Sequence, residues 1–189
     1  MSLLTFNQQG IYCAAADVYI DPWKPVKKAL ITHAHADHAR PGSRKYLAHE
    51  HSVPVMRHRL GSEINVQSIA YNVPVNINGV KFSFHPAGHI PGSAQIRVEH
   101  KGETWVVSGD YKLEDDGLCT PFEPVKCNHF ITESTFGLPV YVWPDQEQLF
   151  KEVNRWWQKN KEAGKVSVVA GYALGKAQRI LKNLDPGIG

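Results

Sequence analysis

Residues 28–38 have the sequence KALITHAHADH, which places three histidines and an aspartate directly after an apolar segment. The segment Lys28 to Thr32 has the composition of a short buried strand. If the chain stays extended beyond it, alternate side chains point the same way, so His33 and His35 face one site. Five of the ten histidines fall between His33 and His51. This clustering of histidines points to metal binding or acid–base chemistry.

The end of the same stretch adds a carboxylate and a third imidazole. If a helix begins near Ala36 and runs to Arg40, Asp37 and His38 project from its first turn. Imidazole nitrogen and carboxylate oxygen are ligands that zinc accepts, with manganese or iron as substitutes. The stretch therefore predicts a metal site. The alternative is a set of surface histidines beside a helix whose N-terminus is capped by Asp37.

Two later segments carry the same ligand types. His89 lies in a glycine-rich loop, AGHIPGS at residues 87–93, between two strand candidates. Asp110 ends the sequence VVSGD, in which a buried-type strand precedes Gly109. A carboxylate at the end of a strand is well placed to bridge two cations. Taken alone, His89 could be structural and Asp110 a turn residue, but the three segments together are much more specific.

Composition limits the class of protein. The chain has 189 residues, of which 42% are hydrophobic and 21% charged, the balance of a folded globular protein. Its net charge of +3 is compatible with a polyanionic partner. No apolar run reaches the roughly 18 residues of a membrane helix, so we expect no membrane partner. Three cysteines without a CxxC pair, and no visible secretory signal, favour a cytoplasmic location.

The first 140 residues are rich in short strand patterns. Glycine turns separate them, and hairpins are expected at Asn76–Gly79 and at Lys101–Gly102. Short helices are expected at Ala36–Arg40 and Glu50–Leu60. The strand candidates are Leu3–Phe6, Ile11–Cys13, Val18–Ile20, Lys28–Thr32, Ser68–Val75, Val80–His85, Gln95–His100, Thr104–Ser108 and Asn128–Thr132.

A different pattern follows Pro139. A helix is predicted over Gln146–Lys161, capped by Asp145, with an apolar stripe that includes Trp156 and Trp157. Core packing explains that stripe, and base stacking is the alternative for the two indoles. A buried strand is expected over Val166–Ala170 and a second helix over Lys176–Leu184. We therefore expect a domain boundary near residues 140–146.

The three ligand segments, in this order, resemble the metal-binding motifs of the metallo-β-lactamase superfamily. Residues 132–137, TESTFG, are similar to an element of its β-CASP nucleases, and residues 170–178, AGYALGKAQ, resemble the opening of the β-CASP insertion. The resemblance, which covers about Gly10 to Gly189, is greatest to bacterial ligase-associated DNA exonucleases, relatives of the messenger-RNA 3′-end processing endonuclease. It implies an α/β fold: the N-terminal part of an αββα sandwich over residues 1–143, then the start of a β-CASP domain over 144–189.

The resemblance also implies a site for two zinc ions. His33, His35 and His89 would hold the first, Asp37 and His38 the second, and Asp110 both. Asp21 would orient a ligand or the bound water, although it could equally be a bend residue before Pro22.

Glu133 matches a motif whose partner histidine comes later in the family. No histidine follows His129, so we expect the chain to be the N-terminal portion of a longer protein. Ser134 and Thr135 would donate hydrogen bonds to phosphate, or cap a turn.

The function implied is that of a zinc-dependent nuclease, with Mn²⁺ as a substitute metal. It would hydrolyse DNA through a dizinc-activated hydroxide, as an exonuclease in DNA repair beside a DNA ligase/helicase system, with Asp37, Asp110, Glu133 and Asp21 as catalytic residues. One alternative is an RNA-processing nuclease. Another is a truncated, inert fragment that binds metal and nucleic acid. The residues after Thr132 argue against a thioester hydrolase with the same first motif.

Four basic residues flank the proposed metal segments. They are candidates to contact a nucleic-acid backbone, and a solvated basic surface is the alternative for each. These residues are Arg40, Arg44, Lys45 and Lys112.

Overall fold

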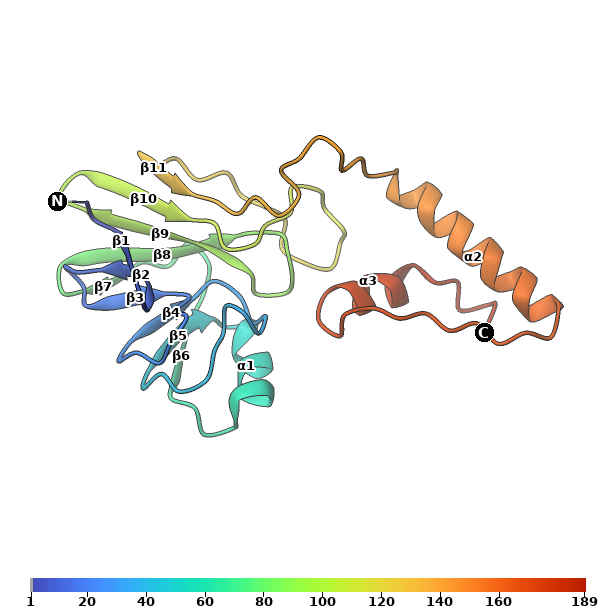
Figure 1. Cartoon of the computed structure of the whole chain (residues 1–189), viewed down its shortest axis with the longest axis horizontal. Helices are drawn as coiled ribbons and strands as arrows, with labels where there is room; N and C mark the ends of the chain where they lie inside the picture. The colour runs from blue at the N-terminus through green and yellow to red at the C-terminus, as the bar shows by residue number, and fades with distance from the viewer. Residues whose placement is uncertain (1) are drawn as a thin grey trace. The chain divides into compact units, whose positions relative to one another are not determined.

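The computed structural model describes residues 2–189, which form two compact units, one ending at Glu133 and the other spanning Ser134–Gly189. The first unit contains eleven strands and one helix among its described residues (Figure 1). The second contains two helices. The candidate metal ligands all lie in the first unit.

The first sheet has six strands in sequence order, β1-β2-β3-β4-β5-β6. β1, β2 and β3 pair antiparallel, whereas β3 to β6 are parallel. Every residue of β4 and β5 is buried, as expected of central parallel strands covered on both faces. The bounds are β1 Thr5–Asn7, β2 Gly10–Cys13, β3 Val18–Ile20, β4 Ala29–Ile31, β5 Tyr46–His49 and β6 Val66–Ile69.

The second sheet has five strands in the order β11-β10-β9-β8-β7. β7 to β10 form an antiparallel meander, and β11 joins β10 in parallel. Both predicted hairpins are confirmed, and the turn between β7 and β8 has positive φ at Asn78 and Gly79. The bounds are β7 Val75–Ile77, β8 Val80–Pro86, β9 Ala94–His100, β10 Glu103–Val107 and β11 His129–Ile131.

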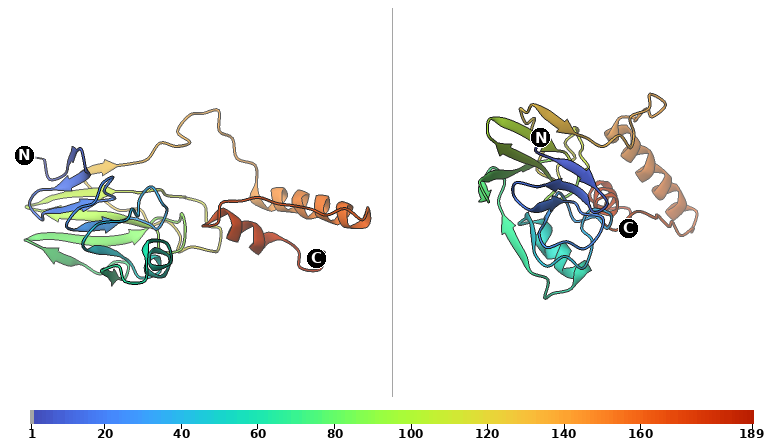
Figure 2. Two further views of the ribbon diagram at one scale, coloured as in Figure 1. Left: turned by 60° about the horizontal axis from the view of Figure 1, so that its bottom comes forward. Right: turned by 60° about the vertical axis from the view of Figure 1, so that its left-hand side comes forward.

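The core lies between the two sheets, which Figure 2 shows from two further directions. Alternate residues of the second sheet, such as Phe82, Phe84 and Ile96, pack against Ile20 and Leu30 of the first. Helix α1, Ser52–Leu60, packs on β5 and β6. The predicted α/β architecture with two packed sheets is confirmed at this level. In the described part of the first unit, α1 is the one helix.

Two local predictions in this unit are wrong, and one strand was missed. No helix forms over Ala36–Arg40: the amide of Ala39 bonds to the carbonyl of His35, giving one turn, and Pro41 disfavours helical geometry at the residue before it. The predicted strand Ser68–Val75 is broken by a turn at Asn72, which has a φ of 62°. Strand β5 was not expected from the sequence, because its four residues are buried on both faces and show no alternation.

The second unit contains the two predicted helices, α2 (Gln146–Glu162) and α3 (Lys176–Asn183). The Asp145 side chain caps α2 by accepting the Gln148 amide at 2.9 Å. The predicted buried strand Val166–Ala170 is wrong: the segment is irregular, and Val166 is 89% exposed. An apolar run cannot form a sheet alone, and no strand lies in residues 134–189.

The apolar stripe of α2 is buried only in part, with Phe150 buried and Trp156 exposed. The placement of the domain boundary at residues 143 and 144 stays a prediction. No helix in residues 2–189 has both the length and the apolar character needed to cross a membrane.

Candidate metal centre

Loops from both sheets meet at one edge of the first unit. His33 and His35 follow β4, His89 lies between β8 and β9, and Asp110 follows β10. The Ala94 amide donates to the carbonyl of Thr32 at 2.8 Å, which joins the sheets at this point. A Cβ on Gly109 would lie 2.6 Å from Thr32 side-chain atoms. Glycine therefore allows the Asp110 loop to approach the histidine segment.

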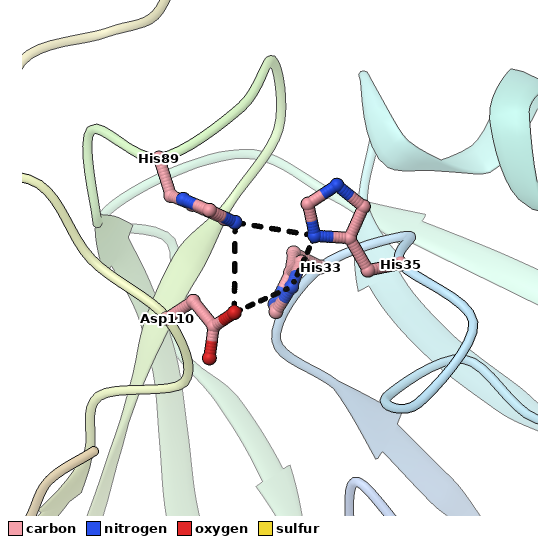
Figure 3. A group of neighbouring side chains, drawn as sticks. All are labelled: His33, His35, His89 and Asp110. Atoms are coloured by element: carbon pink, nitrogen blue, oxygen red, sulfur yellow. Dashed lines mark hydrogen bonds and ion pairs between the residues drawn. The ribbon is translucent and has the colours of Figure 1, made fainter. Parts of the chain in front are cut away.

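Four of the predicted ligands converge on one point (Figure 3). The Nδ1 atom of His35 lies 3.1 Å from His33 Nε2 and 3.1 Å from His89 Nε2. The Oδ2 atom of Asp110 lies 3.7 Å from His33 Nε2 and 3.6 Å from His89 Nε2. One donor atom from each residue lies within 4.8 Å of all the others. The donor atoms of residues up to 77 positions apart therefore lie in one cluster.

The donor set fits a transition-metal ion. With metal–ligand distances of about 2.0–2.1 Å, the donors of a tetrahedral zinc site lie roughly 3.3 Å apart. Four of the six donor separations, 3.1–3.7 Å, bracket this value, and all six are within 4.8 Å. Three imidazoles and one carboxylate are ligands that zinc accepts, and manganese or iron accept them too. The cluster can therefore hold a metal ion, whose identity the donor atoms alone do not select.

The surroundings of His33, His89 and Asp110 keep these three groups in metal-binding protonation states. Burial lowers the pKa of His33 well below its usual value, and neighbouring histidines add to the effect. Burial also lowers the pKa of His89. A hydrogen bond from His38 lowers the pKa of Asp110. The two imidazoles are thus neutral and the carboxylate ionised near pH 7, which are the forms that bind metal.

The imidazole of His38 lies between two carboxylates, Asp110 on one side and Asp21 on the other. Its Nε2 atom lies 3.3 Å from Asp110 Oδ1, and its Nδ1 atom lies 2.7 Å from Asp21 Oδ2. Burial alone would lower the pKa of His38, but hydrogen bonds to Asp110 and Asp21 raise it to about 10 in the chain without an ion. Asp21 therefore orients the ring so that Nε2 faces Asp110.

Thr32 connects these groups, a role that sequence analysis missed. Its amide donates to Asp21 Oδ1 at 2.8 Å, and its hydroxyl donates to Asp21 Oδ2 at 2.5 Å. The same hydroxyl oxygen lies 3.1 Å from His33 Nδ1, so it can accept that N–H. This leaves the lone pair of His33 Nε2 facing the cluster. The hydroxyl residue directly before the first histidine was the available signal.

The remaining predicted residues divide into two groups. The carboxylate of Asp37 lies 3.6 Å from His38 Nε2 and is largely exposed. Glu133 Oε1 accepts the Tyr111 amide at 3.1 Å, and both acids line one cavity with His38 and Asp110. Ser134 and Thr135 belong to the second unit, where the carbonyl of Ser134 accepts the Gly137 amide. Their predicted contact with phosphate stays a prediction.

Two of the flanking basic residues have defined partners. The Lys112 ammonium pairs with Asp116 at 2.5 Å. The Arg40 guanidinium donates to two backbone carbonyls. Arg44 and Lys45 are exposed, as expected of a solvated basic surface.

Comparison with known proteins found relatives by sequence. No family model matches the chain. A "Probable DNA ligase" of Opitutus terrae is 30% identical over 179 residues, which is 93% of this chain and 17% of that protein. "Endoribonuclease YSH1" of Yarrowia lipolytica is 33% identical over 122 residues, 64% of this chain and 14% of that protein.

"Cleavage and polyadenylation specificity factor subunit 3" of Dictyostelium discoideum is 32% identical over 124 residues, 64% of this chain and 16% of that protein. The chain thus spans less than a fifth of the length of each of these relatives. Residues from the three segments that resemble the family's metal-binding motifs, His33, His35, His89 and Asp110, lie in one cluster. Motif order, geometry and relatives agree, and the chain is similar to proteins of the metallo-β-lactamase superfamily, in its β-CASP branch.

Proposed function

We propose that the chain carries the metal centre of a zinc-dependent phosphodiesterase that hydrolyses DNA. The observation that carries the proposal is the convergence of His33, His35, His89 and Asp110 on one point. Beside it, an open cavity is lined by two further acids, Asp37 and Glu133. A catalytic acid needs such access to a substrate. In repair, the activity would be that of an exonuclease working beside a DNA ligase.

Two zinc ions are proposed, with Mn²⁺ as a substitute. The three imidazoles of the cluster would hold the first, and His38 with Asp37 the second. Asp110 supports this division because Oδ2 faces His33 and His89 whereas Oδ1 faces His38. Divalent ions bound there would polarise a phosphoryl oxygen and lower the pKa of water toward about 7.

The chain's own residues would do the rest. The Tyr111 amide holds one oxygen of Glu133 at 3.1 Å and so fixes the carboxyl group beside Asp110. From that position Glu133, together with a histidine partner, would help to protonate the leaving oxygen. Asp21 and Thr32 would keep His38 and His33 in their binding orientations.

DNA is favoured over RNA by the extent of the sequence matches. The DNA ligase relative aligns with 93% of this chain, and the endoribonuclease relative with 64%. An RNA-processing nuclease with the same centre is the second candidate, which the names of the shorter matches favour. The N-terminal portion of an αββα sandwich over residues 1–143 and the start of a β-CASP domain over residues 144–189 belong to the same proposal.

The test combines metal analysis with a nuclease assay. The chain is stripped with EDTA, reloaded with zinc or manganese, and assayed on end-labelled single-stranded DNA and RNA. We expect bound zinc and cleavage of DNA, which His35→Ala and Asp110→Ala abolish while the circular dichroism spectrum is unchanged. The control is His58→Ala, because His58 is exposed on α1. Cleavage of RNA alone selects the second candidate, and zinc binding without cleavage selects an inert binding fragment.

A further inference from the structure

The cavity beside the metal centre extends beyond the ligands themselves. It has a volume of about 330 Å³, within the range of roughly 300–1,000 Å³ of small-ligand pockets. Besides His38, Asp110 and Glu133, its lining includes Trp23 and Arg40. Neither of these two residues is needed to hold a metal ion. All five belong to the first unit.

Trp23 combines a fixed backbone with an exposed ring. Its amide donates to the carbonyl of Gln9 at 2.8 Å, and its own carbonyl accepts from Arg40 at 3.3 Å. The side chain is nevertheless 47% exposed. An indole on an anchored backbone loses little conformational freedom when a flat ligand stacks on it. Aromatic faces of this kind bind nucleobases with little regard to sequence.

Arg40 is held in place without a carboxylate partner. Its Nε atom donates to the Asp37 carbonyl at 3.1 Å, and Nη1 donates to the Trp23 carbonyl at 3.3 Å. Within residues 2–189 no acidic side chain forms an ion pair with it. A guanidinium has five N–H groups, so others are free to bind an anion. Because two carbonyls already orient the group, binding a phosphate costs little further ordering.

We propose that this cavity is a subsite for the nucleotide next to the scissile phosphodiester of a single-stranded nucleic acid. Trp23 stacks on the base, and Arg40 binds a phosphate of the backbone. The inference rests on the proposed function, because the metal centre defines where the scissile bond lies. It explains why an exposed indole and an unpaired guanidinium border the same cavity as Asp110.

Binding is measured separately from cleavage. Single-stranded oligothymidylate is titrated into the chain in EDTA at low salt, where no turnover occurs, and tryptophan emission is followed. We expect binding to quench the emission and Trp23→Phe to remove most of the quenching. Trp23→Ala should weaken binding roughly 5- to 100-fold. The matched control is Trp156→Phe, which removes an exposed indole of α2.

The arginine is tested through salt dependence. Arg40→Gln should weaken binding and reduce the slope of log affinity against log salt by about 0.7, the contribution of one phosphate contact on a single strand. Arg40→Lys should keep that slope, since the charge remains. The control is Arg57→Gln, an exposed arginine of α1 that does not line the cavity. Zinc content of each variant confirms that the metal centre is intact.

Two results would overturn the inference. One is wild-type affinity and quenching in both Trp23→Ala and Arg40→Gln. The other is that the unaltered chain does not bind the oligonucleotide under either condition, in EDTA or with zinc on ice. In both cases zinc-dependent cleavage by the unaltered chain would leave the proposed function standing. If the chain neither binds zinc nor cleaves, the proposed function fails instead.

Discussion

At the scale of single residues, the orientation of the candidate ligands depends on hydrogen bonds from residues that do not themselves face the cluster. The Thr32 hydroxyl donates to Asp21 and lies within reach of His33 Nδ1. Thr32→Val keeps the shape of the side chain and removes these bonds. Since partners of metal ligands commonly contribute 10- to 100-fold in affinity, we expect zinc affinity to fall by about tenfold or more. Competition with a chromophoric chelator measures it. Thr32→Ser should restore the affinity; if it does not, the hydroxyl is not the cause.

A second residue predicts how stability depends on pH. His49 is buried and stacks on Tyr71 at 3.6 Å, and burial lowers its pKa to about 4. The unfolded chain takes up this proton near pH 6.5. The contribution is therefore fully present above pH 6.5 and is lost as the pH falls toward 4, by on the order of 2 kcal/mol at pH 5.

His49→Asn is the variant that tests this dependence. The amide oxygen can still accept the His51 amide, which Nδ1 of His49 accepts at 3.3 Å, but the side chain does not titrate. Urea unfolding at pH 7.5 and pH 5 should show a smaller difference in the free energy of unfolding than for the unaltered chain. Equal differences would mean that His49 is protonated in the folded state.

At the scale of elements, the loop between β8 and β9 decides where His89 lies. The Ser93 side chain is buried and accepts the amides of His89 and Ile90 at 3.0 and 3.1 Å. Ser93→Ala leaves two buried donors without an acceptor, which costs about 1–3 kcal/mol for each. We expect a lower free energy of unfolding and weaker zinc binding. Amide hydrogen exchange should locate the loss of protection in residues 87–93; protection lost throughout the unit would contradict a local effect.

The elements also show which predictions local sequence supports. The hairpins and helices α2 and α3 were predicted because glycine turns and helical periodicity are local signals. The predicted strand at Val166–Ala170 is absent from the structure, because a strand needs a partner strand and its own residues do not supply one. Motif order led us to expect His33, His35, His89 and Asp110 near one another, and their donor atoms do cluster; the roles of Asp37 and His38 stay a prediction. The close approach of Gly109 to Thr32 could not be predicted from the sequence, because it depends on how two distant loops pack.

At the scale of the whole molecule, all four donors of the cluster belong to the first unit. An ion that binds only the folded unit raises the free energy of unfolding by about 2.7 kcal/mol when its concentration is 100 times its Kd. We therefore expect scanning calorimetry to show two transitions, of which zinc raises only one. EDTA should reverse the shift, and the Asp110→Ala variant should show none. A single transition would mean that the two units unfold together, and movement of both transitions would mean that zinc also binds the second unit.

The metal centre draws its donors from both sheets, His33 and His35 from the first and His89 and Asp110 from the second. Neither sheet alone supplies more than two of the four donors in this cluster. High-affinity binding of an ion would therefore require the two sheets to be packed together. An ion bound at this cluster would link the two sheets, which are otherwise held together by apolar packing.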